Sequence, residues 1–206
     1  MYAVGWDDSM ASESKFDVER FNRWAATYDQ SWAQRWYFGP VHSAMISKIA
    51  GDAVVDAPKC ILDVGCGTGR LLRTAAKSWP LARLIGIDPA EHMVAEARRL
   101  TTKADFHVAH AEELPIPDAT VDLALTSVSF HHWRDQQRGL QEIVRVLVPG
   151  GRLCLADHVT PGSRLLEPSV RSLKDIKSLM RGAGLEVLGY RRLWARFMII
   201  VLASKK

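Results

Sequence analysis

The sequence has few cysteines and no long apolar stretch. Its three cysteines, Cys60, Cys66 and Cys154, fall at spacings that indicate neither a disulfide framework nor a zinc site. The longest uninterrupted apolar run, Phe197 to Ala203, has seven residues, whereas a membrane-spanning helix needs about 20. No basic start followed by an apolar stretch opens the chain, so we expect no signal peptide and a cytoplasmic protein.

The composition is that of an ordinary globular protein. The chain has 206 residues, of which 48% are apolar and 24% charged, which fits one domain with a small appendage. The net charge of +4 is unevenly spread, because residues 164–206 hold ten basic and three acidic side chains. Such a basic edge could attract an anionic substrate, lipid headgroups or RNA. A solvated basic face is the interpretation we favour.

The first 50 residues differ in texture from the rest of the chain. Residues 1–15 are polar and are expected to form a loose tail. The stretch from Phe16 to Ile49 is predicted to be helical and is rich in aromatic side chains. Phe21, Trp24 and Tyr28 are spaced to share one helical face. Residues 51–59 are expected to form a linker.

The remainder alternates between predicted strands and helices. Short apolar runs predict strands at residues 60–64, 84–87, 106–109, 121–126, 152–157, 185–193 and 197–204. Helices between most of them predict an α/β fold with a doubly wound, mostly parallel sheet. The last two strands are joined by only Trp194-Ala-Arg196 and are expected to pair antiparallel. Ligands of such sheets bind at the carboxyl ends of the strands.

The segment Asp63–Gly69, with the sequence DVGCGTG, is the strongest chemical signal. It follows a strand and opens a helix, where backbone N–H groups and the helix N-terminus favour an anionic ligand. A dinucleotide fingerprint would need glycine at position 70 or 72, where Arg70 and Leu72 stand. A phosphate loop would need a lysine, which is absent. The pattern G-x-G-x-G, preceded by an acidic residue, fits at every position.

Two aspartates at strand ends are candidate ligand contacts. Asp63 lies in a buried strand, so we expect it to need a partner, either the amides of the glycine turn or a ligand ammonium. The alternative is that it only fixes the turn. Asp88 ends the second strand about 20 residues after the glycine turn, a spacing typical of an aspartate that binds ribose hydroxyls. The segment Asp88–Glu91 also predicts a helix start with Asp88 as the N-cap.

Six segments together resemble the class I S-adenosylmethionine (SAM)-dependent methyltransferases. Within them the sequence is similar to the small-molecule group of the ubiquinone and menaquinone biosynthesis methyltransferases. The resemblance covers residues 21–188 and is carried by Trp24–Asp29, Leu62–Gly69, Gly86–Asp88, Ala111–Asp118, His131–Trp133 and Leu147–Arg152. It implies a Rossmann-like methyltransferase fold of seven strands, with a flexible tail at 1–15, a helical lid at 16–50 and a SAM-binding domain at 58–206.

The family implies a set of residues around SAM and its product, S-adenosylhomocysteine (SAH). The glycine turn holds the methionine part, the position of Asp88 holds the ribose diol, and a backbone amide near Ala111 or Glu112 faces adenine. The slot that usually carries an acidic side chain reads His110, whose neutral imidazole can accept one hydrogen bond. The residues expected to bind the cofactor are Tyr28, Asp63, Gly65, Cys66, Gly67, Gly69, Asp88, Pro89, Met93, His110, Ala111, Glu112 and Ser127.

The catalytic candidates come from the lid and from the loop after the fourth strand. Tyr28 and Trp24 are expected to face the methyl-transfer site, although they could simply pack the helix onto the sheet. The loop 127–133, SVSFHHW, lacks the Asn/Asp-Pro-Pro-aromatic signature of methyltransferases that act on nucleic-acid amines, so no DNA is expected. His131 or His132 is the candidate general base, with packing or SAM contact as the alternative. No metal is expected.

The expected reaction is in-line transfer of the SAM methyl group to a small acceptor. The protein has mainly to orient the reactants and exclude water, which suits an aromatic lid. Trp32, Trp36, Tyr37 and Phe38 favour an apolar or aromatic acceptor, and the short stretch 159–171 argues against quinone specificity. The alternatives are a SAM-binding regulatory protein without turnover and a phospholipid headgroup methyltransferase with peripheral membrane contact. A nicotinamide oxidoreductase is disfavoured by Arg70.

Overall fold

A seven-stranded sheet forms the centre of the protein. The computed structural model describes residues 8–31, 34–51, 57–159, 170–194 and 197–206. The strand order is β3-β2-β1-β4-β5-β7-β6, with β1 to β5 parallel and β7 antiparallel to both of its neighbours. The predicted fold class and the antiparallel C-terminal pair are confirmed. The strands are β1 (Cys60–Val64), β2 (Arg83–Asp88), β3 (Ala104–Val108), β4 (Val121–Ser127), β5 (Leu147–His158), β6 (Leu185–Leu193) and β7 (Met198–Lys205).

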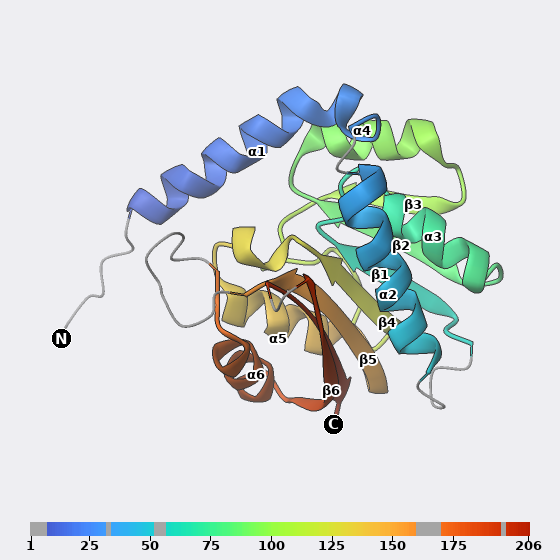
Figure 1. Ribbon diagram of the computed structural model, residues 1–206, viewed down its shortest axis with the longest axis vertical. Coiled ribbons are helices and arrows are strands. Elements are labelled where there is room, and N and C mark those ends of the chain that lie inside the picture. The colour runs from blue at the N-terminus through green and yellow to red at the C-terminus, as the bar shows by residue number, and fades with distance from the viewer. Residues whose placement is uncertain (1–7, 32–33, 52–56, 160–169, 195–196) are drawn as a thin grey trace.

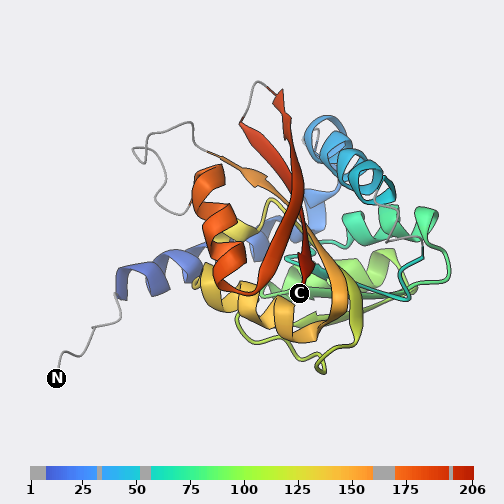
Figure 2. The same ribbon diagram turned by 90° about the horizontal axis from the view of Figure 1, so that it is seen from below.

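Helices cover both faces of the sheet (Figure 1). One face carries α2 (Gly39–Ala50), α3 (Arg70–Ser78) and α4 (Glu91–Leu100), and the other carries α5 (Gln136–Val146) and α6 (Leu173–Gly182). Successive residues of β1 face opposite sides of the sheet, because Ile61 belongs to the same core cluster as Leu72 of α3, while Leu62 belongs to the cluster that contains Leu140 of α5. Figure 2 shows the β6–β7 hairpin rising between α6 and α2.

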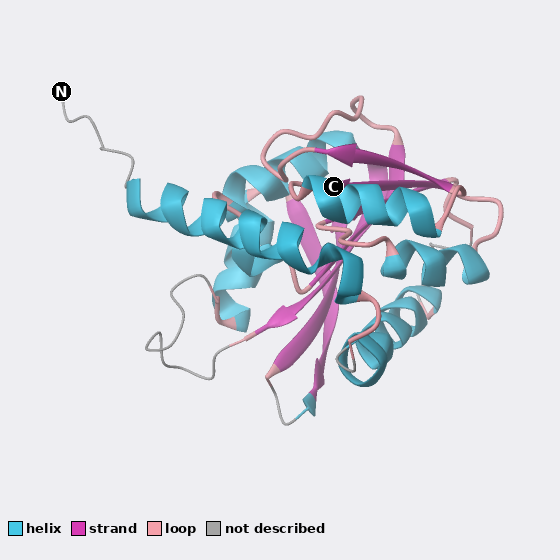
Figure 3. Ribbon diagram, turned by 90° about the horizontal axis from the view of Figure 1, so that it is seen from above, coloured by secondary structure: helices cyan, strands magenta, loops and turns pink. Residues whose placement is uncertain are grey.

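The N-terminal region forms more helix than the sequence predicts. Helix α1 runs over Asp8–Tyr28 and is followed by the π-helix η1 (Gln34–Phe38). Much of the stretch 1–15 that we expected to be a tail is therefore helical. Polar residues there suggested a tail, but alanine, methionine, glutamate and lysine are good helix formers and an aspartate suits a helix start. Figure 3 shows α1 lying across the end of the sheet.

The start of β5 also differs from the prediction. Helix α5 ends at Val146, and Leu147 already belongs to β5, which begins five residues earlier than predicted. Gly150 adopts φ +75 within this strand, and the pairing with β4 shifts register between Val121 and Leu123. Because this irregular start of the strand contains residues typical of turns, the sequence pattern predicts a turn there and not a strand. No described helix combines the length and the apolarity that crossing a bilayer would require.

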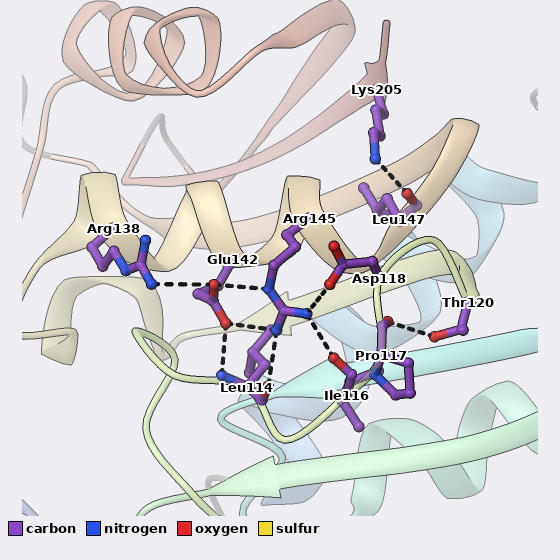
Figure 4. A network of polar contacts seen from close by, with 10 residues as sticks. All are labelled: Leu114, Ile116, Pro117, Asp118, Thr120, Arg138, Glu142, Arg145, Leu147 and Lys205. Atoms are coloured by element: carbon purple, nitrogen blue, oxygen red, sulfur yellow. Dashed lines mark hydrogen bonds and ion pairs between the residues drawn. The ribbon is translucent and has the colours of Figure 1, made fainter.

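A polar network fixes the segment 109–120 against α5 (Figure 4). Arg145 donates to the carbonyls of Leu114 (2.9 Å) and Ile116 (2.8 Å) and to the Asp118 carboxylate (2.6 Å). Glu142 is buried, accepts from the Leu114 amide (2.9 Å) and pairs with Arg145. The Arg145 hydrogen bonds lower the pKa of Glu142 despite its burial. This network determines where the segment that follows β3 lies.

We expect Arg145→Lys to destabilise the fold although the charge is kept. Lysine cannot reproduce the planar fork of donors, so several carbonyls and carboxylate oxygens lose their partner, at a cost of about 1–3 kcal/mol. Urea unfolding followed by circular dichroism measures this. Arg138→Lys is the matched control, because Arg138 lies on the same helix, is exposed and contacts Glu142 at 3.4 Å; it should change stability by at most about 0.5 kcal/mol. Equal losses for both variants would contradict the assignment.

Candidate functional site

The glycine turn after β1 is attached to the end of β2. The amides of Gly65 and Cys66 both donate to the carbonyl of Ile87, at 2.8 and 3.0 Å. The Gly67 amide donates to the Asp88 carboxylate at 2.8 Å. Gly65 has φ +76, and a Cβ there would lie 1.8 Å from the Ser129 hydroxyl oxygen. Only glycine fits this position, because both the backbone conformation and the space exclude a side chain.

Asp63 is a fully buried carboxyl whose Oδ1 has no hydrogen-bond partner. The sheet register places it between Gly86 of β2 and Leu125 of β4. Burial, and then the nearby negative charge of Asp88, raise the pKa of Asp63 to about 8. Several turn amides that were expected to partner it bond instead to Ile87 and Asp88. A positively charged ligand group would supply the hydrogen-bond donor that Asp63 Oδ1 lacks.

Asp88 joins the glycine turn to the start of α4. One carboxylate oxygen accepts from the Gly67 amide and the other from the Ala90 amide at 2.9 Å. Burial raises the pKa of Asp88 to about 6, against the opposing effect of these two hydrogen bonds. The prediction that Asp88 is the N-cap is wrong, because Ala90 takes that position and α4 begins at Glu91. Asp88 still ends β2, so its carboxylate remains at the sheet edge.

Two adjoining cavities lie at the carboxyl ends of β1, β2 and β4. The larger contains about 820 Å³ of space that no atom fills, part of it open to solvent. The smaller contains Asp63 and shares Tyr28, Gly65, Gly67 and Ser127 with the larger. Most predicted site residues line one cavity or both: Tyr28, Asp63, Gly65, Cys66, Gly67, Asp88, Pro89, Met93, His110, Ala111, Glu112, Ser127 and His132.

Three predicted residues lie elsewhere. Gly69 has φ +76 at the start of α3 and lies close to Phe106, where it shapes the turn without lining a cavity. His131 is buried behind the cavity wall, and Trp24 is half-exposed and lines neither cavity. Trp24 lies at the edge of the inward stripe of α1, which has Val18 and Phe21 nearer its centre.

The cavity lining includes residues that the sequence analysis missed. Val18 and Phe21 come from α1, and their spacing from Tyr28 on one helical face is the signal that could have identified Val18. Val128 has φ +53, a strained conformation for a β-branched residue, and strain of this kind is typical of functional sites. The sequence carries no local signal for that strain.

His110 and Glu112 face the larger cavity from the segment after β3. Burial, and then the Arg134 charge, lower the pKa of His110, so its imidazole is neutral at neutral pH and can accept a hydrogen bond. Glu112 accepts from the Asp135 amide at 2.9 Å through one carboxylate oxygen. This bond ties the segment to the start of α5, where Asp135 is the N-cap.

The two adjacent histidines take different places. His132 lines the larger cavity and makes a T-shaped contact with Phe21, with ring centroids 5.5 Å apart. His131 lies behind it, with ring centroids 3.9 Å apart, and its Nδ1 is 2.7 Å from Asp157 Oδ1. The His131 amide also donates to Asp157 at 3.0 Å. Asp157, at the end of β5, was not identified from the sequence.

The end of α1 is held close to the glycine turn. Asp29 accepts from the Thr68 hydroxyl and forms an ion pair with Arg73 of α3. Earlier in α1, the Asn22 side chain accepts from the His92 amide at 2.9 Å. These contacts place Tyr28 over the turn. Within the predicted lid, α1 therefore packs beside the cavities, whereas α2 packs on a face of the sheet.

Comparison with known proteins identifies methyltransferases as relatives of this chain. Residues 62–155 match a family described as a methyltransferase domain. The chain is 30% identical over 197 residues to 27-O-demethylrifamycin SV methyltransferase from Amycolatopsis mediterranei. The match covers 81% of this chain and 72% of that relative. It is 37% identical over 113 residues to demethylmenaquinone methyltransferase from Thermus thermophilus, 53% of this chain. The match spans about half of the second relative's length (51%).

Solved structures show the same fold at lower identity. A SAM-dependent methyltransferase from Aquifex aeolicus has a TM-score of 0.67 and 21% identity, over 80% of this chain and 89% of that chain. The cyclase SpnF has a TM-score of 0.70 and 23% identity, over 80% of each chain. A cyclase among these neighbours means that the fold does not by itself establish the reaction.

We expect Asp63→Asn to alter the pH dependence of stability in the ligand-free protein. The folded pKa of Asp63, about 8, lies above its ordinary value of 3.8, so its contribution is complete below pH 3.8 and is lost as the pH rises towards 8. Burial lowers the pKa of His42 to about 4, which acts in the opposite direction mainly between pH 4 and 6.5, and the Asp88 pKa of about 6 confines the loss from that group mainly to lower pH. The free energy of unfolding should therefore fall by about 1–2 kcal/mol between pH 6.5 and 8 in the wild type.

Urea unfolding at several pH values measures this difference. The Asp63→Asn protein should show a flatter curve over that interval, because it has no carboxyl to ionise. Asp105→Asn, at an exposed position on β3, serves as the control. Parallel curves for wild type and Asp63→Asn would show that the Asp63 pKa is not raised.

Proposed function

Because this chain belongs to the class I SAM-dependent methyltransferases, we propose that it methylates a small apolar or aromatic acceptor held in the larger cavity. One observation supports this proposal most strongly. Asp63, a buried carboxyl whose Oδ1 has no hydrogen-bond partner, lies directly beside an apolar and aromatic cavity. When bound, SAM supplies a methyl group already activated on a sulfonium sulfur.

The residues around the two cavities fit the parts of SAM. Asp63 supports binding of the amino-acid ammonium, because no donor satisfies its Oδ1. Asp88 lines the larger cavity, and each of its oxygens retains acceptor capacity beyond its one backbone hydrogen bond, which suits a ribose diol. The neutral imidazole of His110 suits the exocyclic amine of adenine. The backbone of Ala111 lies beside it.

The acceptor end of the cavity is apolar and aromatic. Val18, Phe21 and Tyr28 from α1 face His132 and Trp133 from the loop after β4. Such a lining favours a flat apolar ligand with few polar groups. With α1 held over the turn by Asp29, these side chains would orient the acceptor and exclude water while the methyl group moves.

We propose His132, rather than His131, as the side chain that receives a proton from the acceptor. His132 lines the cavity, whereas His131 is buried and bonded to Asp157. A base is required only where the acceptor is a hydroxyl, an acidic carbon or a protonated amine. The close contact of the two rings allows His131 to fix the orientation of His132.

The proposed activity is tested with an acceptor panel. Purified protein and SAM are incubated with phenols, hydroquinones, alkaloid-like amines and aliphatic alcohols, and SAH and methylated product are quantified by mass spectrometry. We expect product with at least one aromatic hydroxyl or amine. For a hydroxyl acceptor, His132→Ala should lower kcat by about 10²–10⁴-fold. The exposed His107→Ala on β3 is the control and should leave kcat unchanged.

Binding is measured in parallel to separate the possible failures. At 100 times its Kd, SAH should stabilise the protein by about 2.7 kcal/mol, seen as a raised Tm, whereas NAD should have no effect. SAH binding without product across the panel would favour a non-catalytic SAM-binding role. Equal kcat values for His132→Ala and the wild type would remove the proposed base.

A further inference from the structure

A second cluster of chemically capable side chains lies beside the acceptor wall. The end of β5 carries Asp157 and His158, and the short helix η2 (Phe130–His132) brings His131 to them. One ligand atom from each of the three residues lies within 4.8 Å of the other two. His131 Nδ1 is 2.7 Å from Asp157 Oδ1, and His158 Nδ1 is 3.8 Å from the same oxygen.

We propose that His131, Asp157 and His158 bind one divalent cation of the first transition row, of the zinc or cobalt type. Such an ion lies about 2.0–2.2 Å from nitrogen and oxygen ligands, so its ligand atoms are separated by roughly 3.4 Å in a tetrahedral site. The separations of 2.7 and 3.8 Å lie on either side of this value, and the two histidine ligand atoms lie within 4.8 Å of each other, so modest side-chain adjustments would close the site.

The donor set decides the class of ion. Two imidazoles and one carboxylate suit zinc, cobalt or ferrous iron, whereas magnesium and calcium prefer oxygen ligands alone. Three protein ligands also leave at least one coordination position open for water. The buried thiols lie apart from this cluster, as Cys154 packs in the core on the α2 and α3 side.

The surrounding contacts are those of a metal site with an ordered outer shell. The Tyr37 hydroxyl bonds to His158 Nε2, which allows the other ring nitrogen, Nδ1, to face the ion. Metal-binding histidines usually make a bond of this kind from the nitrogen that does not bind the ion. Two backbone amides, from His131 and His158, donate to the Asp157 carboxylate at 3.0 and 2.7 Å and hold it in place.

Burial and exposure are also suitably divided. Asp157 is 1% exposed and His131 8% exposed, so an ion between them would be largely shielded from water. The His158 side chain is 38% exposed and offers a route of entry. Tyr37, which bonds to His158, also stacks on Trp194 with ring centroids 4.7 Å apart. This contact connects Tyr37 to the β6–β7 hairpin.

A bound ion would connect three parts of the protein. It would join β5 to the loop after β4 directly, and through Tyr37 it would reach η1 of the predicted lid. Because His131 packs on His132, the ion would fix the wall of the acceptor cavity. The inference does not depend on methyl transfer, since the three ligands lie outside both cavity linings.

The test uses untagged full-length protein treated with a chelator and then dialysed. Titration with Co²⁺ is followed by visible absorption, and Zn²⁺ binding is followed by calorimetry. We expect one ion per chain in the wild type. His158→Gln, at a partly exposed position, should weaken binding at least tenfold, and Asp157→Asn should abolish it. Tyr37→Phe should weaken it by about 10–100-fold, as expected for an outer-shell residue.

His107→Gln, at an exposed histidine of β3, is the matched control and should bind like the wild type. SAH binding is measured on the same samples. Absence of stoichiometric uptake by protein that binds SAH would overturn the metal site alone. Unchanged uptake in His158→Gln would overturn it as well, because the ion would then bind elsewhere. Loss of SAH binding with normal metal uptake would instead contradict the proposed function.

Discussion

The site is organised around one buried carboxyl that the protein leaves without a full set of partners. Asp63 lies in the middle of the sheet, where burial raises its pKa to about 8. Glycine-turn amides that could have satisfied it bond to Ile87 and Asp88 instead. A buried, ionised carboxylate without partners costs free energy unless a cation lies beside it. In the proposed function, the ammonium of SAM supplies this cation.

The rest of the structure holds other surfaces around that point. Parallel strands bring the ends of β1, β2 and β4 to one edge, and Arg145 fixes the segment that carries His110 and Ala111. Helix α1, anchored through Asp29, supplies the aromatic side of the larger cavity. The strand ends, the segment after β3 and α1 thus each contribute one wall, and no single element makes the site.

The strand positions and the cavity-lining loops could be predicted because they depend on local patterns. The DVGCGTG segment needs its glycines for the turn itself, and apolar runs identify buried strands whatever surrounds them. The two histidines could not be distinguished, because the position of His131 depends on Asp157 from another strand. The exposure of Trp24 depends on how α1 is rotated against α4. The spacing of apolar residues along α1 does not determine that rotation to within one residue. The start of β5 was missed because its glycines imitate a turn.

The most direct measurement is the number of protons released when SAH binds at pH 7, obtained by calorimetry in buffers of different ionisation enthalpy. In the free protein Asp63 is mostly protonated, since its pKa is about 8, and a ligand ammonium beside it would lower that pKa. The account predicts that the wild type releases about one proton more per bound SAH than Asp63→Asn does. Equal proton release from the two proteins, with SAH bound to both, would contradict it.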